Sequence, residues 1–340
     1  MSAADLLLRA QTSGAVTYSG YVESNGTLRL PVSDHFSDVP DLFGGRINMR
    51  VWWGGKDDWR VDHLSVTGET DLYHDASGTT SWNYEANRAI RTRDAGVRLP
   101  RTSDLLPPVL SQRLLGDAHA DEVTRLASAN VAGVDAPGLR LRPSDEQSSI
   151  NHVDVWVEPA SGLPLKVAIF ATGADVAALT TTFVDVSVEP PSATATSFTL
   201  PRGADIRFED VVDIEAAANR YAPIGAPMQL AGMSRHDTGR GAVGVYGRGV
   251  TELLAIPLWQ PAADPLRAQL AVTPGASITD IGTTLGVGPL NLLLTKPAFA
   301  GHSWLLVGTV TSRTLVGAAE ELRSAPLRTR AGELLGVGRN

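Results

Sequence analysis

Three glycines in the last third of the chain, Gly239, Gly241 and Gly244, fit the pattern G-x-G-x-x-G, which binds the pyrophosphate of dinucleotides in many enzymes. That chemistry needs a strand before the glycines and a helix after them, because N–H groups at the helix N-terminus hold the phosphates. Two further glycines, Gly247 and Gly249, follow closely and leave no room for a helix to begin. We therefore interpret this stretch as a glycine-rich hairpin and not as a nucleotide site.

Residues that could bind a metal ion are scattered along the chain without ligand spacing. His63, Asp71 and His74 could converge across adjacent strands as a metal site, but isolated surface histidines are the more common arrangement. The histidines are His35, His63, His74, His119, His152, His236 and His302. We predict no bound metal.

An acidic loop between residues 31 and 45 carries Asp34, Asp38 and Asp41. Three aspartates in one loop could be imagined as calcium ligands, but they lack the spacing of an EF-hand. A solvated acidic loop is the favoured interpretation.

Patterns for nucleophilic or hydrolytic catalysis are also missing. The sequence has no G-x-S-x-G turn, no phosphate-binding loop ending in G-K-[ST], and no H-E-x-x-H. Ser303 follows His302, but two adjacent residues do not make a catalytic triad. The absence of cysteine excludes disulfides, thiolate metal sites and a cysteine nucleophile. We predict a protein that is not an enzyme and has no cofactor.

The composition is that of a globular protein, with 43% hydrophobic and 19% charged residues. Its net charge of −8 argues against nucleic acid as a partner and against attraction to an anionic membrane surface. No apolar run reaches the ~20 residues that a helix needs to cross a bilayer. The length of 340 residues predicts two domains.

The first half of the chain is predicted to be an antiparallel meander. Apolar and polar residues alternate from Ile47 to Trp53, and strands of similar length are predicted at 59–66, 69–74 and 79–84. We expect a further strand pair between residues 16 and 30, turned at Asn25-Gly26, which is a strong hairpin signal.

Helices are predicted at two places in this half. Ser2 and Asp5 resemble a capping box that begins a short helix ending at Gly14. Leucine-rich residues 103–126 are expected to form one or two helices across the open end of the sheet.

A β-hairpin from Val153 to Phe170 is the best-patterned element. Its two arms alternate apolar and polar residues around Pro159-Ala160-Ser161-Gly162, where the chain must reverse. We expect Gly162 to take a backbone conformation that a side chain would oppose.

The string Trp-Val-Glu-Pro-x-x-Gly-Leu-Pro-Leu-Lys at 156–166 resembles the MucB/RseB family and the wider LolA/LolB-like group. Met-Arg-Val-Trp-Trp at 49–53, Asp-Trp-Arg-Val-Asp at 58–62 and Ser-Trp-Asn-Tyr at 81–84 look like consecutive strands of that family, and Ser-Phe-Thr-Leu-Pro-Arg-Gly-Ala at 197–204 looks like its closing phrase. The resemblance implies a mainly β protein with α-helices, in which an antiparallel half-barrel with packed helices surrounds an apolar cavity.

The domain organisation follows from the same comparison. We predict a LolA/RseB-like half-barrel domain at 1–208, a linker at 209–227, a smaller α/β domain resembling the MucB/RseB C-terminal domain at 228–327, and a tail at 328–340. In the α/β domain strands are expected at 228–234, 242–246, 250–258, 290–294 and 304–310, and helices at 264–270 and from Thr311 or Ser312 to Arg323.

The cavity would be lined by one-face residues of the clearest strands, although the same residues could equally be plain core. Four tryptophans, Trp52, Trp53, Trp59 and Trp82, fall in this region and leave the same two readings open. The candidate ligand-binding residues are Met49, Val51, Trp53, Val61, Val155, Leu165 and Val167.

The resemblance implies a function as well. MucB/RseB proteins bind the extracytoplasmic region of an anti-sigma factor and release it when envelope stress supplies a competing ligand. The expected ligand is a lipid, a lipoprotein or a hydrophobic peptide, and the alternative function is a LolA-like lipid or lipoprotein carrier.

Location and partner binding are expectations of the same kind. We expect an extracytoplasmic protein of the cell envelope or periplasm, whose signal or membrane anchor is not part of this sequence. The second domain could bind a partner by strand addition at 242–246 or 250–258, or it could merely cap the barrel.

Overall fold

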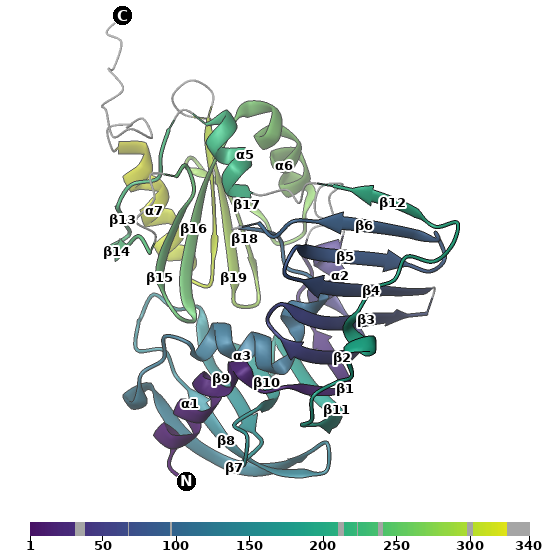
Figure 1. The fold of residues 1–340 in the computed structure, drawn as a ribbon. Helices are drawn as coiled ribbons and strands as arrows, with labels where there is room; N and C mark the ends of the chain where they lie inside the picture. The colour runs from purple at the N-terminus through teal and green to yellow at the C-terminus, as the bar shows by residue number, and fades with distance from the viewer. Residues whose placement is uncertain are drawn as a thin grey trace, which may run out of the picture.

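The computed structural model describes residues 1–30, 38–66, 68–95, 97–209, 214–222, 224–236, 241–297 and 302–324. Two β-sheets, each with its own helices and its own hydrophobic core, lie one after the other along the chain (Figure 1). This arrangement confirms the predicted fold class of a large antiparallel sheet followed by a smaller α/β unit.

The first sheet curls into an open half-barrel and contains twelve strands among the described residues. Neighbouring strands are antiparallel except β12 and β6, which are parallel. In spatial order the strands are β12 (Asp205–Phe208), β6 (Arg88–Thr92), β5 (Gly78–Asn83), β4 (Gly68–Asp75), β3 (Asp58–Ser65), β2 (Arg46–Gly55), β1 (Tyr18–Gly26), β11 (Leu179–Ser187), β10 (Pro164–Ala171), β9 (Ile150–Val157), β8 (Val134–Leu141) and β7 (Val123–Val131).

The predicted meander is confirmed in strands β2 to β5, but the predicted hairpin at Asn25-Gly26 is wrong. Both residues continue β1, where Asn25 lies opposite Arg46 of β2, and neither has the positive φ that such a turn requires. A Cβ atom at Gly26 would lie 2.0 Å from the carbonyl oxygen of Phe43. Glycine is used here for close approach of two backbone segments and not for a turn.

The hairpin of β9 and β10 is confirmed, and Gly162 has a φ of +80°. The Glu158 carboxylate accepts hydrogen bonds from the backbone N–H groups of Ala160 and Ser161 and so closes the turn. A Cβ atom at Gly162 would lie 2.7 Å from the carbonyl oxygen of Arg9, at the end of the first helix. The turn therefore also forms the surface on which that helix rests.

Helices cover the inner face of the half-barrel and bury its core. Ser2 and Asp5 form the predicted capping box at the start of α1. The segment 103–126 is only partly helical, because residues from Val123 onward form edge strand β7. The helical elements of this unit are α1 (Ala3–Thr12), η1 (Ser13–Ala15), α2 (Asp38–Gly44), η2 (Thr102–Leu105), α3 (Pro107–Leu115), η3 (Ala120–Glu122) and α4 (Ala193–Thr196).

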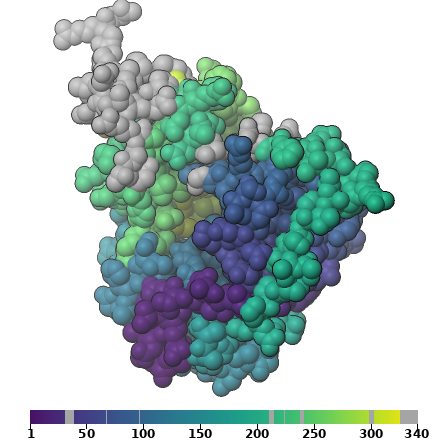
Figure 2. Space-filling model, in the orientation of Figure 1, coloured from purple at the N-terminus to yellow at the C-terminus, as the bar shows by residue number. Residues whose placement is uncertain are grey.

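The segment that follows β11 crosses the outer face of the sheet before it ends as β12 at the far edge. Figure 2 shows it as a teal band over the blue strands. Phe198 in this band packs against Tyr73 and Trp82, whose ring centroids lie 5.1 and 6.0 Å away. Asp62, Asp71 and Trp82 on the outer face of β3 to β5 are buried, whereas Tyr73 stays half-buried.

The second sheet contains six described strands, all antiparallel to their neighbours. In spatial order they are β15 (Gly244–Arg248), β16 (Thr251–Leu258), β20 (Ser303–Gly308), β19 (Leu290–Thr295), β18 (Gly282–Val287) and β17 (Ser277–Ile278). The expected strand at 228–234 is instead a small hairpin. Its helices and hairpin are α5 (Ile214–Tyr221), α6 (Gln260–Val272), α7 (Ser312–Ser324), β13 (Gln229–Leu230) and β14 (Met233–Ser234).

The predicted linker at 209–227 belongs in part to this second unit. Ala218, Ala222, Ile224 and Ala226 are buried in the second core. The packed unit therefore begins within the linker range. The predicted tail at 328–340 lies outside the described residues.

The two units are joined by backbone hydrogen bonds as well as side chains. The Ser149 N–H donates to the carbonyl oxygen of Thr309 at 3.0 Å, and the Thr311 N–H donates to that of Gln147 at 2.7 Å. Arg248 of β15 reaches back to Glu122 of the first unit at 2.6 Å. No helix in the described part of the chain has both the length and the apolar character needed to cross a membrane.

Candidate functional site

Four aromatic rings form a continuous stack across the inner face of the half-barrel. Tyr18, Trp53, Trp59 and His74 come from β1, β2, β3 and β4, and each is the register partner of the next. Successive ring centroids lie 5.9, 5.7 and 5.0 Å apart, with interplanar angles of 5°, 6° and 13°. Cross-strand pairing thus aligns four residues that lie far apart in the sequence.

A groove opens at the Tyr18 end of this stack, between the sheet and the helices. Its volume is about 260 Å³, and its walls come from η1, the start of β1, one side of α3 and Trp53 of β2. The Tyr18 hydroxyl is buried without a hydrogen-bond partner among the described residues, and burial raises the pKa of Tyr18 well above its usual value. The lining residues are Ser13, Gly14, Val16, Tyr18, Trp53, Pro108, Val109, Gln112 and Arg113.

Of the seven residues predicted to line a cavity, Trp53 lies in the groove wall. The other six have no exposed surface, because η2, α1 and α3 cover the inner face and place leucines such as Leu105 and Leu106 against the strands. They belong to the first core in this conformation, and their role in ligand binding stays a prediction. These six are Met49, Val51, Val61, Val155, Leu165 and Val167.

Three arginines gather around one buried carboxylate beside the groove. Arg98 binds Asp104 through two nitrogens at 2.7 and 2.9 Å, and Arg113 adds a third contact at 3.0 Å. Arg101 donates its backbone N–H to Asp104 and places its guanidinium 5.4 Å from the centre of the Trp59 ring. Burial alone would raise the pKa of Asp104, but the hydrogen bonds from Arg98 lower it.

The far end of the stack is polar. His74 Nδ1 lies 3.0 Å from the Thr79 hydroxyl, which also accepts a hydrogen bond from Arg101 at 2.7 Å. Burial lowers the pKa of His74, so the ring is neutral near pH 7. The metal site imagined from His63, Asp71 and His74 is not formed, because residues 71 and 74 of one strand point to opposite faces of the sheet.

A second group of charges lies on the outer face, beneath the band that carries Phe198. Asp62 and Asp71 are directly opposite each other on β3 and β4, and neither has exposed surface. Arg60 donates to both carboxylates, at 2.6 and 2.8 Å, and its guanidinium lies 4.9 Å from the ring centres of Trp52 and Tyr73.

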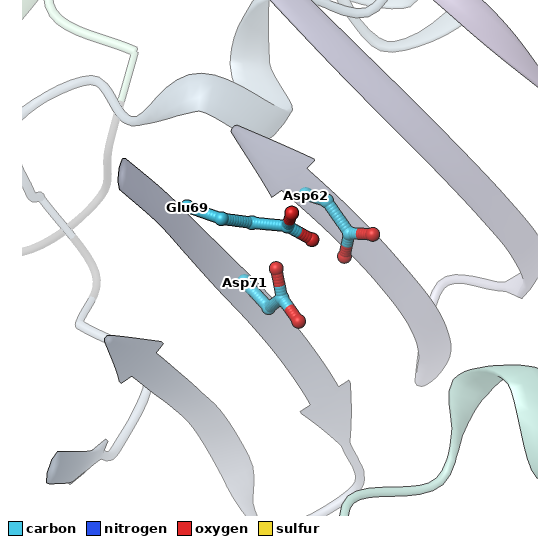
Figure 3. A group of neighbouring side chains, drawn as sticks. All are labelled: Asp62, Glu69 and Asp71. Carbon is cyan, nitrogen blue, oxygen red and sulfur yellow. The ribbon is translucent and has the colours of Figure 1, made fainter. Parts of the chain in front are cut away.

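Figure 3 shows Glu69 beside this pair, and ligand oxygens of the three acids lie within 4.8 Å of one another. A divalent cation needs several such oxygens to be available, but Arg60 donates to both aspartates and Arg50 binds Glu69 at 2.9 Å. Asp71 Oδ1 is buried without a hydrogen-bond partner among the described residues. Burial and the neighbouring charge of Asp62 raise the pKa of Asp71 to about 6. The arrangement fits an internal ion-pair network that holds a proton better than it fits a metal site.

The remaining sequence motifs have structural explanations where they are described. Of the G-x-G-x-x-G glycines, Gly239 lies outside the described residues, and Gly244 begins strand β15 rather than a helix. The Ser303 hydroxyl accepts a hydrogen bond from Arg267 at 2.8 Å. Asp34 of the imagined calcium loop lies outside the described residues as well.

The arginine group and the outer-face network were not predicted from the sequence, and of the groove wall only Trp53 was among the predicted cavity residues. One feature of the sequence could have indicated the outer-face network: the charged residues Arg60 and Asp62 lie on either side of the apolar Val61 in a well-patterned strand. It marks two polar positions on one face, but their partners on β4 follow only from the strand register.

No protein-family model matches the sequence, and no curated protein matches it. Solved structures do match. A crystal structure of MucB aligns with a TM-score of 0.52 and 14% identity, over 94% of this chain and 96% of that chain. The MucA/MucB complex of Pseudomonas aeruginosa aligns with a TM-score of 0.52 and 14% identity, over 93% and 96%. The described chain therefore has the fold of MucB, here a half-barrel followed by a smaller α/β unit.

Proposed function

We propose that this protein is a non-catalytic, extracytoplasmic binding protein that regulates an anti-sigma factor. The half-barrel would sense a lipid or a hydrophobic peptide, and the second unit would contact the extracytoplasmic region of the anti-sigma factor. The observation that carries this proposal is an apolar groove within a chain that aligns with both units of MucB over nearly its full length. Two of the similar structures contain MucB bound to MucA, which supports a partner of that kind.

The size of the groove favours sensing over transport. Pockets for small molecules commonly measure ~300–1,000 Å³, and this groove, at about 260 Å³, lies just below that range. It suits one acyl chain or a few apolar side chains, and a carrier of lipids with several acyl chains would need a larger space. The LolA-like carrier is therefore the second candidate. It would require the covering helices to move and open the space around Met49 and Val155.

Of the two strands expected from the sequence to bind a partner, one is closed in the second unit and the other is partly occupied. Strand β16 is paired on both edges, so strand addition at 250–258 is excluded. The outer edge of β15 is partly occupied, because the His236 N–H donates to the carbonyl oxygen of Val245. Tyr221 and Trp259 instead form an exposed stacked pair with ring centroids 5.3 Å apart. Exposed aromatic residues of this kind commonly anchor interfaces.

The ligand part of the proposal is tested on the purified full chain. Native mass spectrometry should detect a bound acyl chain, or a fluorescent fatty acid should bind. Val109→Trp places a large ring in the groove and should abolish binding, whereas Val184→Trp, at an exposed position on the outer face of β11, should not. Equal binding by both variants would remove the groove from the proposal.

The partner part is tested by passing detergent-solubilised envelope proteins over the immobilised full chain and identifying those retained. Retention of an anti-sigma-type membrane protein, lost in Trp259→Ala and kept in Phe208→Ala, would support regulation. Phe208 is a matched control because it is an exposed aromatic residue of the first unit. Retention of lipoproteins alone would favour the carrier.

A further inference from the structure

The arginine group beside the groove carries more positive charge than its acidic partner balances. Arg98, Arg101 and Arg113 surround Asp104, and Arg98 alone already binds both carboxylate oxygens. Asp94 is exposed and lies 3.9 Å from Arg101. Glu252 of β16 also interacts with the charge of Arg113, which opposes the burial that raises the pKa of this acid. Arg101 Nε is buried without a hydrogen-bond partner among the described residues. Burial and the charge of Arg98 lower the pKa of Arg101 to about 10, as expected where positive charges are crowded.

Arg113 connects this charge to the groove. Its side chain belongs to the groove wall together with Trp53 and Val109, and it is 56% exposed. One of its nitrogens binds Asp104, and its other nitrogens have no partner in the described part of the chain. A guanidinium at the rim of an apolar groove offers a planar pair of donors that matches a carboxylate or a phosphate.

We propose that the groove selects amphiphiles with one apolar chain and a negatively charged head, and that Arg113 binds the head. This inference rests on the proposed function, because it names the class of ligand that the groove would take. The chain would lie along Tyr18 and Trp53, and the carboxylate or phosphate would face Arg113. An uncharged head would lose the charge-assisted hydrogen bonds but keep the apolar contacts.

The test compares three ligands with the same dodecyl chain, all below their micelle concentrations: dodecanoate, dodecyl phosphate and dodecyl maltoside. Their dissociation constants for the full chain are measured by calorimetry. We expect the two anionic ligands to bind at least ~10-fold more tightly than the maltoside at low salt, with a smaller ratio at high salt. The ratio between carboxylate and phosphate identifies the preferred head.

Variants then locate the effect. Arg113→Gln should reduce the anionic preference to about one, and Arg113→Lys should retain part of it because the charge remains but the planar fork does not. Arg142→Gln is the matched control, since it removes the same charge from an exposed position that contacts Asn151 and is not part of the groove wall. Arg142→Gln should leave all three dissociation constants unchanged.

The outcomes separate this inference from the proposed function. Equal binding of all three ligands, or an anionic preference that survives in Arg113→Gln, would overturn the role of Arg113 while the groove itself remains. If none of the three ligands binds, both the inference and the ligand part of the proposed function fail. Should Arg113→Gln not fold, Arg113→Lys and the salt dependence still decide the question.

Discussion

Replacing Asp71 with asparagine should make the protein more stable near neutral pH. Asp71 is fully buried opposite Asp62, and its pKa in the folded protein is raised to about 6 by burial and by the charge of Asp62. Its value in an unfolded chain is close to 3.8. Because the folded state binds this proton more strongly, stability from Asp71 is fully present below about pH 4 and is lost as the pH rises through about 6.

The size of the effect follows from the same two pKa values. Each unit of pKa corresponds to about 1.4 kcal/mol, so ionising Asp71 lowers the free energy of unfolding by about 3 kcal/mol above pH 7. Asparagine resembles the protonated acid, because its oxygen can accept from Arg60 while its amide donates toward Asp62. Asp71→Asn should therefore equal the wild type at pH 4 and exceed it in stability at pH 7.5.

Urea unfolding at several pH values between 4 and 8 measures the difference between variant and wild type, and other titrating groups cancel in that difference. Asp75→Asn is a control that should lower the free energy of unfolding where Asp71→Asn raises it. Arg91 and Ser77 lower the pKa of Asp75 to about 2 against the effect of burial. Stability from Asp75 is present above about pH 4 and is lost as the pH falls through about 2. Asp75→Asn should therefore be less stable than the wild type by a nearly constant amount between pH 4 and 8. If the difference in stability between Asp71→Asn and the wild type does not change with pH, the explanation that the folded state holds a proton on Asp71 is refuted.

Three further predictions concern the first unit and its junction with the second. Gly162→Ala should lower the free energy of unfolding by ~1 kcal/mol or more beyond the loss in Gly173→Ala, measured by chemical unfolding. Both glycines have positive φ, but only at Gly162 would a Cβ atom meet the end of α1. Equal losses in the two variants would show that α1 does not rest on this turn. Arg248→Ala should raise the pKa of Glu122 from about 2 toward its usual value, as measured by NMR titration. Hydrogen bonds from Arg248 lower this pKa, whereas burial raises it. An unchanged pKa would show that His119 and Ser144 cause the lowering instead. Tyr18→Phe should leave the free energy of unfolding unchanged or raise it by up to ~1 kcal/mol, because the hydroxyl is buried without a described partner; a clear loss on thermal melting would contradict that description.

Local alternation was enough to predict strands β2 to β5 and the β9–β10 hairpin, because each has one buried face and a short connection. The predicted helical segment 103–126 wrongly includes the first four residues of edge strand β7, because this strand has only its first and last residues buried and so lacks the alternation of a central strand. The Asn25-Gly26 signal failed because tertiary pairing with β2 and β11 prevailed over local turn preference.

The candidate site could be predicted only as a region. Trp53 was identified as a lining residue from its strand face, but Tyr18 and Arg113 come from distant segments that only the folded sheet and α3 bring together. Asp62 faces Asp71 only because of the register in which β3 pairs with β4. The turn between the two strands fixes that register, and alternation within one strand does not reveal it.

The pairing of β1 with β11 has a consequence for the order of folding. Apart from β12 at one edge, the half-barrel consists of two runs of sequential hairpins, β2 to β6 and β7 to β11. Strand β1 connects the two runs, because Ser19 pairs with both Trp52 and Ser187. Each run closes through short loops, whereas the β1–β11 seam joins residues at opposite ends of the unit and is therefore the slow contact to form. During synthesis one edge of β1 stays unpaired until β11 emerges. Until then the Tyr18 ring also lacks its edge-on contact with Phe183 of β11. The rate at which this seam closes should therefore set how long a newly made chain can pair wrongly with its neighbours.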